Sequence, residues 1–211
     1  MFNGIIQYLG IIYNIKQTRN ITTIFVKVSK NFIFNLQIGD SVSNNGCCLT
    51  VTNIYHNNII SFDIIKHTLE MTTFKTIKLG DLINLEKSLK INTYIGSHII
   101  LGHITDTAYI VRITQHDVYI SIWIKLNNIK HMKYIITKGS ICIDGVGLTI
   151  DQVLKNKFSV NIIPQTLAKT TLYLKRINNS VNVEIDIFIK TIVHITEKFL
   201  KNYLYKFFKS I

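Results

Sequence analysis

Two short stretches of the sequence combine a tight turn with side chains that could do chemistry. The stretch Asn45-Gly46-Cys47-Cys48-Leu49-Thr50-Val51 has a counterpart in Asp144-Gly145-Val146-Gly147-Leu148-Thr149-Ile150. Small residues favour a turn and a β-branched residue favours a strand, so each stretch is expected to present a threonine hydroxyl where a strand begins. The first stretch also carries two thiols. A duplicated arrangement of this kind indicates two related pockets.

The three cysteines, Cys47, Cys48 and Cys142, do not suggest a metal site or a disulfide framework. They form no CxxC or Cys/His ligand spacing, and their number is odd. The N-terminal residues have neither the charged nor the apolar segment of a secretory signal, and no apolar run approaches the roughly 18 residues of a membrane span. We therefore expect a soluble, cytoplasmic protein without a metal.

The net charge of +12 in 211 residues raises the possibility of an anionic partner. However, only 3 of the 24 basic residues are arginine, the residue that is best suited to phosphate groups and base edges. The lysines are scattered and form no long basic block. We therefore expect solvated surface lysines and no nucleic-acid partner.

The elements that must position these residues are mainly strands. From Gly4 to Glu86, short runs rich in Ile, Val, Phe and Thr alternate with Asn, Gly, Asp and Lys pairs, which is typical of an antiparallel sandwich or barrel. Strands are predicted at 24–28, 59–64 and 82–86, with a hairpin turn at 55–58. A short helix is predicted around 68–72, where Leu69 and Met71 replace β-branched residues.

The second half of the chain repeats the first. A shift of 98 positions aligns Gly4-Ile5-Ile6 with Gly102-His103-Ile104, residues 61–73 with 159–171, and residues 83–86 with 181–184. The two turn stretches align at a shift of 99, so one residue of turn length must differ between the halves. Two copies of this length predict two domains of one β-rich fold, with a boundary near residues 92–97.

After Asp186 the pattern changes to one with helical spacing. Apolar residues recur every three or four positions, at Ile192, Ile195, Phe199, Tyr203 and Phe207, and the apolar face is widened by Leu200, Leu204 and Phe208. Such a face favours packing against the same helix of other subunits. Lysines on the other face leave a membrane-surface helix as the alternative, although nothing else in the chain points to lipid.

Five separated motifs resemble the riboflavin synthase alpha chain family. They are Met1-Phe2-Asn3-Gly4-Ile5-Ile6-Gln7, the first turn stretch, Gly96-Ser97-His98 through Gly102-His103, Gly139 through Gly145 with Leu148-Thr149, and Ile163-Pro164-Gln165-Thr166-Leu167. The resemblance covers Met1 to about Ile189. It implies an all-β fold of two similar six-stranded Greek-key β-barrels in tandem, at 1–97 and 98–189, followed by an oligomerisation helix at 190–211.

The resemblance also implies an activity. Two molecules of 6,7-dimethyl-8-ribityllumazine would react by transfer of a four-carbon unit, giving riboflavin and 5-amino-6-ribitylamino-uracil in the last step of riboflavin biosynthesis. No cofactor is implied. Each barrel would bind one lumazine, and the active site would form between the N-terminal barrel of one subunit and the C-terminal barrel of the next in a homotrimer. An association with lumazine synthase is left open.

By the same resemblance, the reaction needs a group that exchanges protons near neutral pH, and His103 is the candidate. Cys48 and Thr149 are the other predicted catalytic residues, with Cys48 as a small packed apolar residue the competing interpretation. Contacts to the ring and the ribityl chain are expected from both barrels. The predicted substrate-binding set is Phe2, Gly4, Ile5, Ile6, Ser41, Cys48, Leu49, Thr50, Asp63, Ile64, Ile65, Lys66, His67, Thr68, Gly102, His103, Ile104, Lys138, Gly147, Leu148, Thr149, Ile162, Ile163, Pro164, Gln165, Thr166, Leu167 and Asp186.

The sequence departs from the family pattern at four positions. Gly147 stands where a serine is usual, His67 where a glutamate is usual, Ser97 where a second glycine is usual, and Asn3 where a threonine is frequent. Gly147 removes a hydroxyl from the expected site. This favours the alternative of a non-catalytic lumazine- or flavin-binding protein of the same fold, whereas Cys48 and His103 favour the enzyme.

Overall fold

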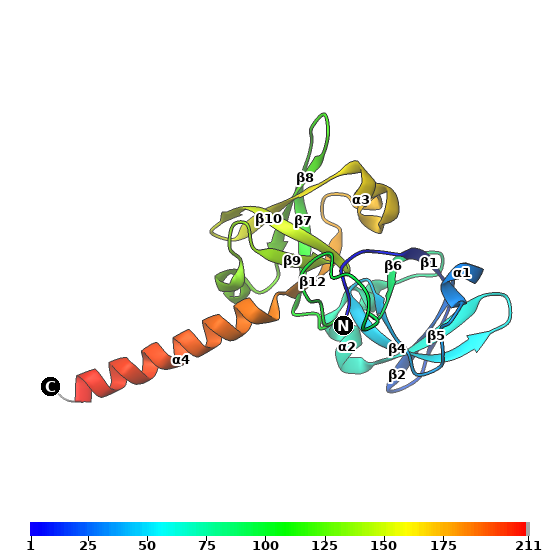
Figure 1. Ribbon diagram of the computed structural model, residues 1–211, viewed down its shortest axis with the longest axis horizontal. Helices are drawn as coiled ribbons and strands as arrows, with labels where there is room; N and C mark the ends of the chain where they lie inside the picture. Colours follow the sequence, from blue (N-terminus) through cyan, green and yellow to red (C-terminus); the bar gives the residue numbers. More distant parts are fainter. Residues whose placement is uncertain (210–211) are drawn as a thin grey trace.

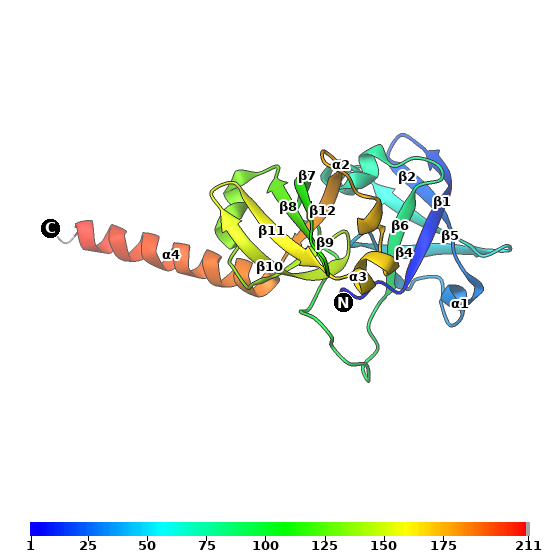
Figure 2. The same cartoon turned by 90° about the horizontal axis from the view of Figure 1, so that it is seen from above.

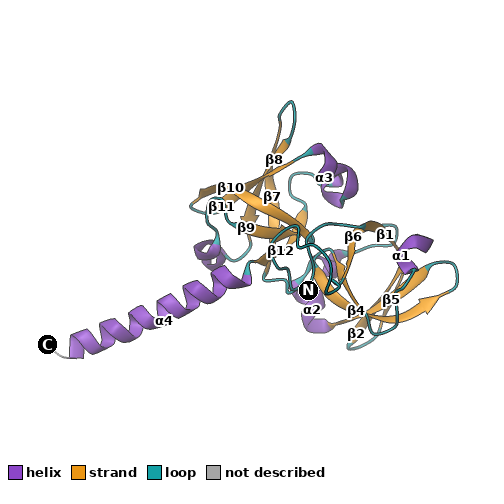
Figure 3. Ribbon diagram, viewed as in Figure 1, coloured by secondary structure: helices purple, strands orange, loops and turns teal. Residues whose placement is uncertain are grey.

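The computed structural model describes residues 1–209, without the side chains of 204 and 206–209. The expected apolar positions Leu204, Phe207 and Phe208 therefore lie outside the described side chains. Two closed six-stranded antiparallel barrels follow one another along the chain, and a long helix extends away from the second (Figure 1). Figure 3 shows that strands build almost all of both barrels, with the short helices at their edges. The predicted fold class is confirmed.

The first barrel closes because its strands bury one face and expose the other. Strand order around it is β1-β2-β5-β4-β3-β6, and alternate residues of β2, such as Ile24 and Val26, point into the core. Phe62 and Ile83 fill its centre. The strands are β1 (Tyr8–Gln17), β2 (Ile21–Lys27), β3 (Ser41–Asn44), β4 (Cys47–Tyr55), β5 (Ile59–Ile65) and β6 (Leu82–Lys87).

Three short helical segments border the first barrel: α1 (Lys30–Ile33), α2 (Lys66–Met71) and η1 (Thr73–Thr76). The predicted helix around 68–72 is confirmed by α2. This helix begins directly after β5, and η1 is capped by Thr72, whose hydroxyl accepts a hydrogen bond from the Phe74 backbone N–H.

The second barrel has its own core, with Ile124, Phe158 and Val181 among its buried residues. Its strand order is β10-β11-β8-β7-β12-β9. The elements are β7 (Asp106–Gln115), β8 (Ile120–Leu126), η2 (Ile129–Tyr134), β9 (Ser140–Ile143), β10 (Val146–Leu154), β11 (Lys157–Ile162), α3 (Pro164–Lys169), η3 (Thr171–Leu174) and β12 (Ser180–Ile185).

The elements of the two barrels match at the predicted shifts. Strand β7 starts 98 positions after β1, and β10 starts 99 positions after β4. The extra residue enters in the turn after β7, at 116–119 against 18–20. It is removed again in the hairpin before β11, at 155–156 against 56–58.

The linker between the barrels leaves β6 after Lys87 and reaches β7 at Asp106. Figure 2 shows part of it as a loop that extends away from both barrels. Where the linker returns, Ile100 forms an isolated antiparallel bridge with Phe2 at the start of the chain. The N-terminal segment and the end of the linker therefore lie side by side between the barrels.

Helix α4 (Ile187–Lys209) begins directly after Asp186, ahead of the start at 190 that the sequence suggested. The Lys133 ammonium of η2 contacts both carboxylate oxygens of Glu197 at 2.7 and 2.8 Å, which ties the helix to the second barrel. Its apolar side chains Ile192, Ile195 and Phe199 are at least 60% exposed. In the described part of the chain, no helix is both long enough and apolar enough to cross a membrane.

Candidate functional site

Two buried carboxylates hold the two short segments that border the site. Glu184 on β12 accepts backbone hydrogen bonds from Leu101, Gly102 and His103 at 2.8 to 3.1 Å. Glu86 on β6 does the same for the N-terminal segment, through Asn3 and Gly4. The two carboxylates occupy equivalent positions in the repeat. Each fixes the segment that leads into the first strand of its own barrel.

Each of these segments lies against the opposite barrel. The Cys48 backbone N–H of β4 donates to the Gly102 carbonyl at 2.9 Å, and the Gly147 N–H of β10 donates to the Gly4 carbonyl at 2.9 Å. Gly4 and Gly102 have positive φ angles of 72° and 81°. A Cβ atom at Gly102 would lie 2.5 Å from the Cys48 Cβ, so only glycine permits this approach.

The environment of the two carboxylates favours their protonated forms. Burial raises the pKa of Glu86 to about 7, although the N–H groups of Asn3, Gly4 and Ile5 and the charged N-terminus act in the opposite direction. Burial also raises the pKa of Glu184. Near neutral pH the attachment of the N-terminal segment is therefore sensitive to protonation.

The crossing of the Gly102 segment onto the first barrel forms a cavity of about 350 Å³, here called the N-cavity. It is lined by the start of β4, by α2 with the following threonine, and by the segment from the other half of the chain. Its lining residues are Cys47, Cys48, His67, Thr68, Met71, Thr72, Gly102, His103 and Ile104.

The crossing of the Gly4 segment onto the second barrel forms a smaller cavity of about 190 Å³, here called the C-cavity. Its lining residues are Gly4, Ile5, Ile6, Val146, Gly147, Gln165, Thr166, Lys169 and Thr170. Each of these nine positions is the repeat equivalent of one of the nine that line the N-cavity. The duplicated pockets expected from the sequence therefore exist, and each is built from both halves of the chain.

The two cavities differ in the chemistry of their walls. In the N-cavity, the His103 and His67 imidazoles and the Cys48 thiol are available for proton transfer or nucleophilic attack. In the C-cavity, the equivalent positions are Ile5, Gln165 and Gly147. The threonine pairs at 68 and 166 and at 72 and 170 are the same, as are Gly102 and Gly4, and Ile104 and Ile6. Among the lining residues, the imidazoles and thiols thus belong to the N-cavity, whereas the C-cavity has the ammonium group of Lys169.

The thiols of the first turn stretch have different environments. Cys47 lies in the core of the first barrel, where burial and the neighbouring charges of Cys48 and Glu184 raise its pKa to about 12. Cys48 is only partly buried and packs with Phe2, Ile100 and the buried Cys142. Cys48 is therefore the more accessible thiol of the pair.

The sequence matches the Lumazine binding domain family twice, over residues 3–88 and 101–186. These two ranges correspond to the two barrels with their crossing segments. The chain belongs to the lumazine-binding domain family. The riboflavin synthase of Buchnera aphidicola subsp. Schizaphis graminum (strain Sg) is 42% identical over 209 residues, which cover 99% of this chain and 100% of that protein. The riboflavin synthase of Escherichia coli (strain K12) is 40% identical over 200 residues, which cover 95% and 93%.

Solved structures of lumazine-binding proteins have the same arrangement of barrels. The crystal structure of LumP complexed with riboflavin aligns with a TM-score of 0.81 and 26% identity, covering 88% of this chain and 99% of that one. LumP complexed with 6,7-dimethyl-8-(1'-D-ribityl) lumazine aligns with a TM-score of 0.79 over the same shares. Relatives of this chain therefore include both riboflavin synthases and a protein crystallised with lumazine and flavin ligands.

The structure brings only part of the predicted site set into the two cavities. The cavity walls contain twelve of its members: Gly4, Ile5, Ile6, Cys48, His67, Thr68, Gly102, His103, Ile104, Gly147, Gln165 and Thr166. These residues are the turn stretches, the crossing segments and the first turns of α2 and α3. They form the strongest part of the candidate site.

The other predicted residues do not line either cavity. Thr50 and Thr149 are exposed on β4 and β10, where Thr50 pairs with Ser41. Asp63 accepts a hydrogen bond from the Thr23 hydroxyl at 2.6 Å, and Lys138 contacts Asp151 at 3.3 Å. Of the remaining members, Phe2, Leu49, Ile64 and Ile162 are buried, and Leu148 and Leu167 pack against the second core. Ile65, Lys66, Ile163 and Pro164 are exposed where α2 and α3 begin, and Asp186 precedes α4.

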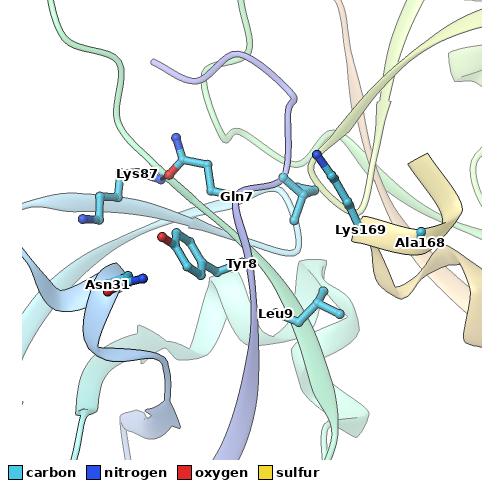
Figure 4. A pocket seen from close by; sticks show the side chains of 8 residues that line it. Gln7, Tyr8, Leu9, Asn31, Lys87, Ala168 and Lys169 are labelled. Carbon is cyan, nitrogen blue, oxygen red and sulfur yellow. Dashed lines mark hydrogen bonds between the residues drawn. The ribbon is translucent and has the colours of Figure 1, made fainter. Parts of the chain in front are cut away.

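A wider hollow of about 690 Å³ runs along β1 between α1 and α3 (Figure 4). Gln7, Tyr8 and Lys87 line it on one side and Lys169 on the other. It shares Ile6 and Lys169 with the C-cavity, so the two spaces adjoin. In this hollow the Lys87 ammonium donates a hydrogen bond to the Phe34 carbonyl at 2.8 Å.

Several residues that line the cavities were not identified from the sequence. These are Cys47, Met71, Thr72, Val146, Lys169 and Thr170. Met71 with Thr72, and Lys169 with Thr170, lie at the ends of α2 and α3, one turn beyond His67 and Gln165. Residues four apart on a helix share a face, so Met71 could have been inferred from His67 and Lys169 from Gln165. The repeat relates the two pairs to each other.

Proposed function

We propose that this protein is a riboflavin synthase. As a transferase, it would convert two molecules of 6,7-dimethyl-8-ribityllumazine into riboflavin and 5-amino-6-ribitylamino-uracil by four-carbon transfer. The observation that carries the proposal is the equivalence of the nine positions that line each cavity. Two pockets of one design suit a reaction between two molecules of one substrate. The near full-length similarity to riboflavin synthases supports it.

The differences between the cavities support different roles for the two substrate molecules. One lumazine must lose a proton from its C7 methyl group, and the other must accept a nucleophile at C7. His103 is the candidate for the proton transfer, because its imidazole is exposed at the N-cavity while its backbone N–H is fixed by Glu184 at 3.1 Å. Cys48 stands across this cavity as a candidate nucleophile. The products contain all the atoms of the two substrates, so the reaction needs no oxidant.

The direct test is incubation of the purified protein with the lumazine while riboflavin absorbance is recorded. We expect riboflavin and the pyrimidine product in equal amounts. The second candidate is a non-catalytic lumazine- or flavin-binding protein, favoured by the similarity to LumP and by Gly147. Tight binding of the lumazine without any product would establish this candidate and overturn the first.

We further propose that three copies assemble through α4, so that the N-cavity of one subunit faces the C-cavity of the next. The exposed apolar side chains of Ile192, Ile195 and Phe199 support an oligomer, because such a row is unfavourable in water. Phe199→Glu should convert the oligomer to monomers in light scattering, whereas the matched charge change Lys201→Glu should not. A cytoplasmic location and an association with lumazine synthase stay predictions from the sequence.

A further inference from the structure

The C-cavity lacks a polar side chain at a position where the N-cavity has one. Cys48 and Gly147 are repeat equivalents, since each is the second residue of β4 or β10 and donates its backbone N–H to a crossing glycine. Cys48 contributes a thiol to the N-cavity wall. Gly147 contributes no side chain to the C-cavity wall.

The space next to Gly147 is occupied by another polar side chain. A Cβ atom at Gly147 would lie 2.5 Å from the Oγ of Ser97 and 3.2 Å from its Cβ. Ser97 belongs to the linker between the barrels and comes 50 positions earlier in the chain. Ser97 is not among the nine lining residues of the C-cavity, but its hydroxyl lies beside the place where the side chain of one of them, residue 147, would begin.

The linker is fixed in this place by the N-terminal segment. The Asn3 side chain accepts a hydrogen bond from the Gly96 N–H at 2.6 Å and donates one to the Tyr94 carbonyl at 3.0 Å. A Cβ atom at Gly96 would lie 2.8 Å from the Ile5 side chain, so the linker is in close contact with the wall of the C-cavity. Asn3 itself is held by Glu86.

The Ser97 hydroxyl also has a partner that orients it. Its Oγ lies 3.2 Å from Nδ1 of His98. Burial lowers the pKa of His98, although the Asp186 carboxylate acts in the opposite direction, so the environment favours the neutral imidazole. The imidazole exchanges one hydrogen bond with the Ser97 hydroxyl in a direction set by its tautomer, and in either tautomer the hydroxyl keeps hydrogen-bonding capacity for a ligand.

We propose that Ser97 supplies the C-cavity with the ligand-binding hydroxyl that position 147 lacks. The ligand class is a heterocycle of the lumazine type, with polar ring atoms that can exchange hydrogen bonds with the hydroxyl. The inference rests on the proposed function, because the cavity is assigned to lumazine there. It assigns a specificity-determining role to a residue of the linker.

The proposal predicts that positions 97 and 147 are coupled. Gly147 lies in extended strand, so its backbone accepts any side chain. A serine introduced at 147 next to Ser97 would compete with it for the same space, whereas a serine at 147 next to a glycine at 97 would restore one hydroxyl at the site. The hydroxyl would then come from strand β10 instead of the linker.

The first test is Ser97→Ala, with Ser88→Ala as the matched control from the same linker. Loss of one hydrogen bond predicts about 2- to 10-fold weaker binding of the lumazine, measured by its fluorescence. Turnover should fall at least as much. Ser88 is not one of the residues next to Gly147, so its variant should behave as the wild type. Equal binding and turnover by Ser97→Ala and the wild type would overturn the inference.

The second test is the exchange of the two residues. Ser97→Gly should be defective, Gly147→Ser should be impaired by crowding, and Ser97→Gly/Gly147→Ser should regain most of the wild-type affinity. Additive losses in the double variant would contradict the coupling. Thermal unfolding of each variant separates misfolding from loss of the hydroxyl. If the wild type neither binds nor converts the lumazine, the proposed function fails; if only the variants show no effect, this inference fails alone.

Discussion

Asn84 and Asn182 make the same hydrogen bonds in opposite directions across the boundary between the barrels. The Asn84 amide donates to the Asp144 carbonyl at 2.8 Å, and the Asn182 amide donates to the Asn45 carbonyl at 2.9 Å. Both asparagines are fully buried. These two hydrogen bonds connect each barrel to the turn stretch of the other, at the start of β4 and of β10. The barrels are therefore related by an approximate twofold symmetry at the site.

Asn84→Ala should destabilise the joined barrels. The side chain also accepts a hydrogen bond from the Thr171 N–H at 2.7 Å, so its loss leaves two buried backbone groups without partners. We expect a decrease of about 2–4 kcal/mol in the free energy of unfolding. Urea denaturation measures this value, and the exposed Asn20→Ala is the control. A decrease in the free energy of unfolding below about 0.5 kcal/mol would show that the Asn84 hydrogen bonds are not needed for stability.

Stability should decrease as pH rises through the titration range of Glu86. Its pKa in the folded protein is about 7, above the ordinary value of 4.5, so the folded state binds the proton more tightly than the unfolded state. The contribution is full below pH 4.5 and is lost as pH rises through 7, by about 3 kcal/mol at most. Urea unfolding of the wild type and Glu86→Gln at pH 5 and pH 8 measures it.

The control for this prediction is the change in unfolding free energy between pH 5 and pH 8 in Glu86→Gln, compared with the same change in the wild type. Glutamine resembles the protonated carboxyl and does not titrate, so Glu86→Gln should gain stability relative to the wild type as the pH rises. Glu184 shifts in the same direction and leaves a residual slope in the variant. Identical slopes in both proteins would mean that Glu86 is ionised throughout this range.

His103→Gln should lose turnover while keeping the fold. The Gly102 segment is held through the His103 backbone N–H and not through its imidazole, so the cavity should stay in place. Loss of proton transfer predicts a rate decrease of about 10²- to 10⁴-fold with little change in lumazine binding. Initial rates of riboflavin formation give the result. His56→Gln, in the hairpin between β4 and β5, is the control; equal rates for both variants would remove His103 from the reaction.

Cys48 should react with thiol reagents before the other two cysteines. Reaction requires the thiolate, and burial raises the pKa of Cys47 to about 12 and that of Cys142 well above its usual value. Cys48 is only partly buried and lines the N-cavity. Mass spectrometry after brief alkylation at pH 8 identifies the modified residue. Cys48→Ala should abolish the rapid phase and Cys142→Ala should not, and bound lumazine should slow it.

The sequence alone determined the fold of each half and the kinds of residue available for chemistry. The β-branched content of β2 and β5 is a local property, and local patterns can be read directly. The repeat then gave two barrels and identified the two turn stretches as equivalent. His103 and Cys48 could be selected because their motifs resemble those of a known family.

Only the tertiary structure decided which half supplies each wall of the site. The contact of Gly102 with Cys48, and of Gly4 with Gly147, depends on the buried carboxylates of Glu184 and Glu86 and on glycines that permit close approach. No local periodicity encodes such long-range contacts, because they form only when both barrels are folded. The proximity of Ser97 to Gly147 is of the same kind. Ser97 and Gly147 depart from the family pattern at positions far apart in the sequence, and the fold brings these two residues into contact.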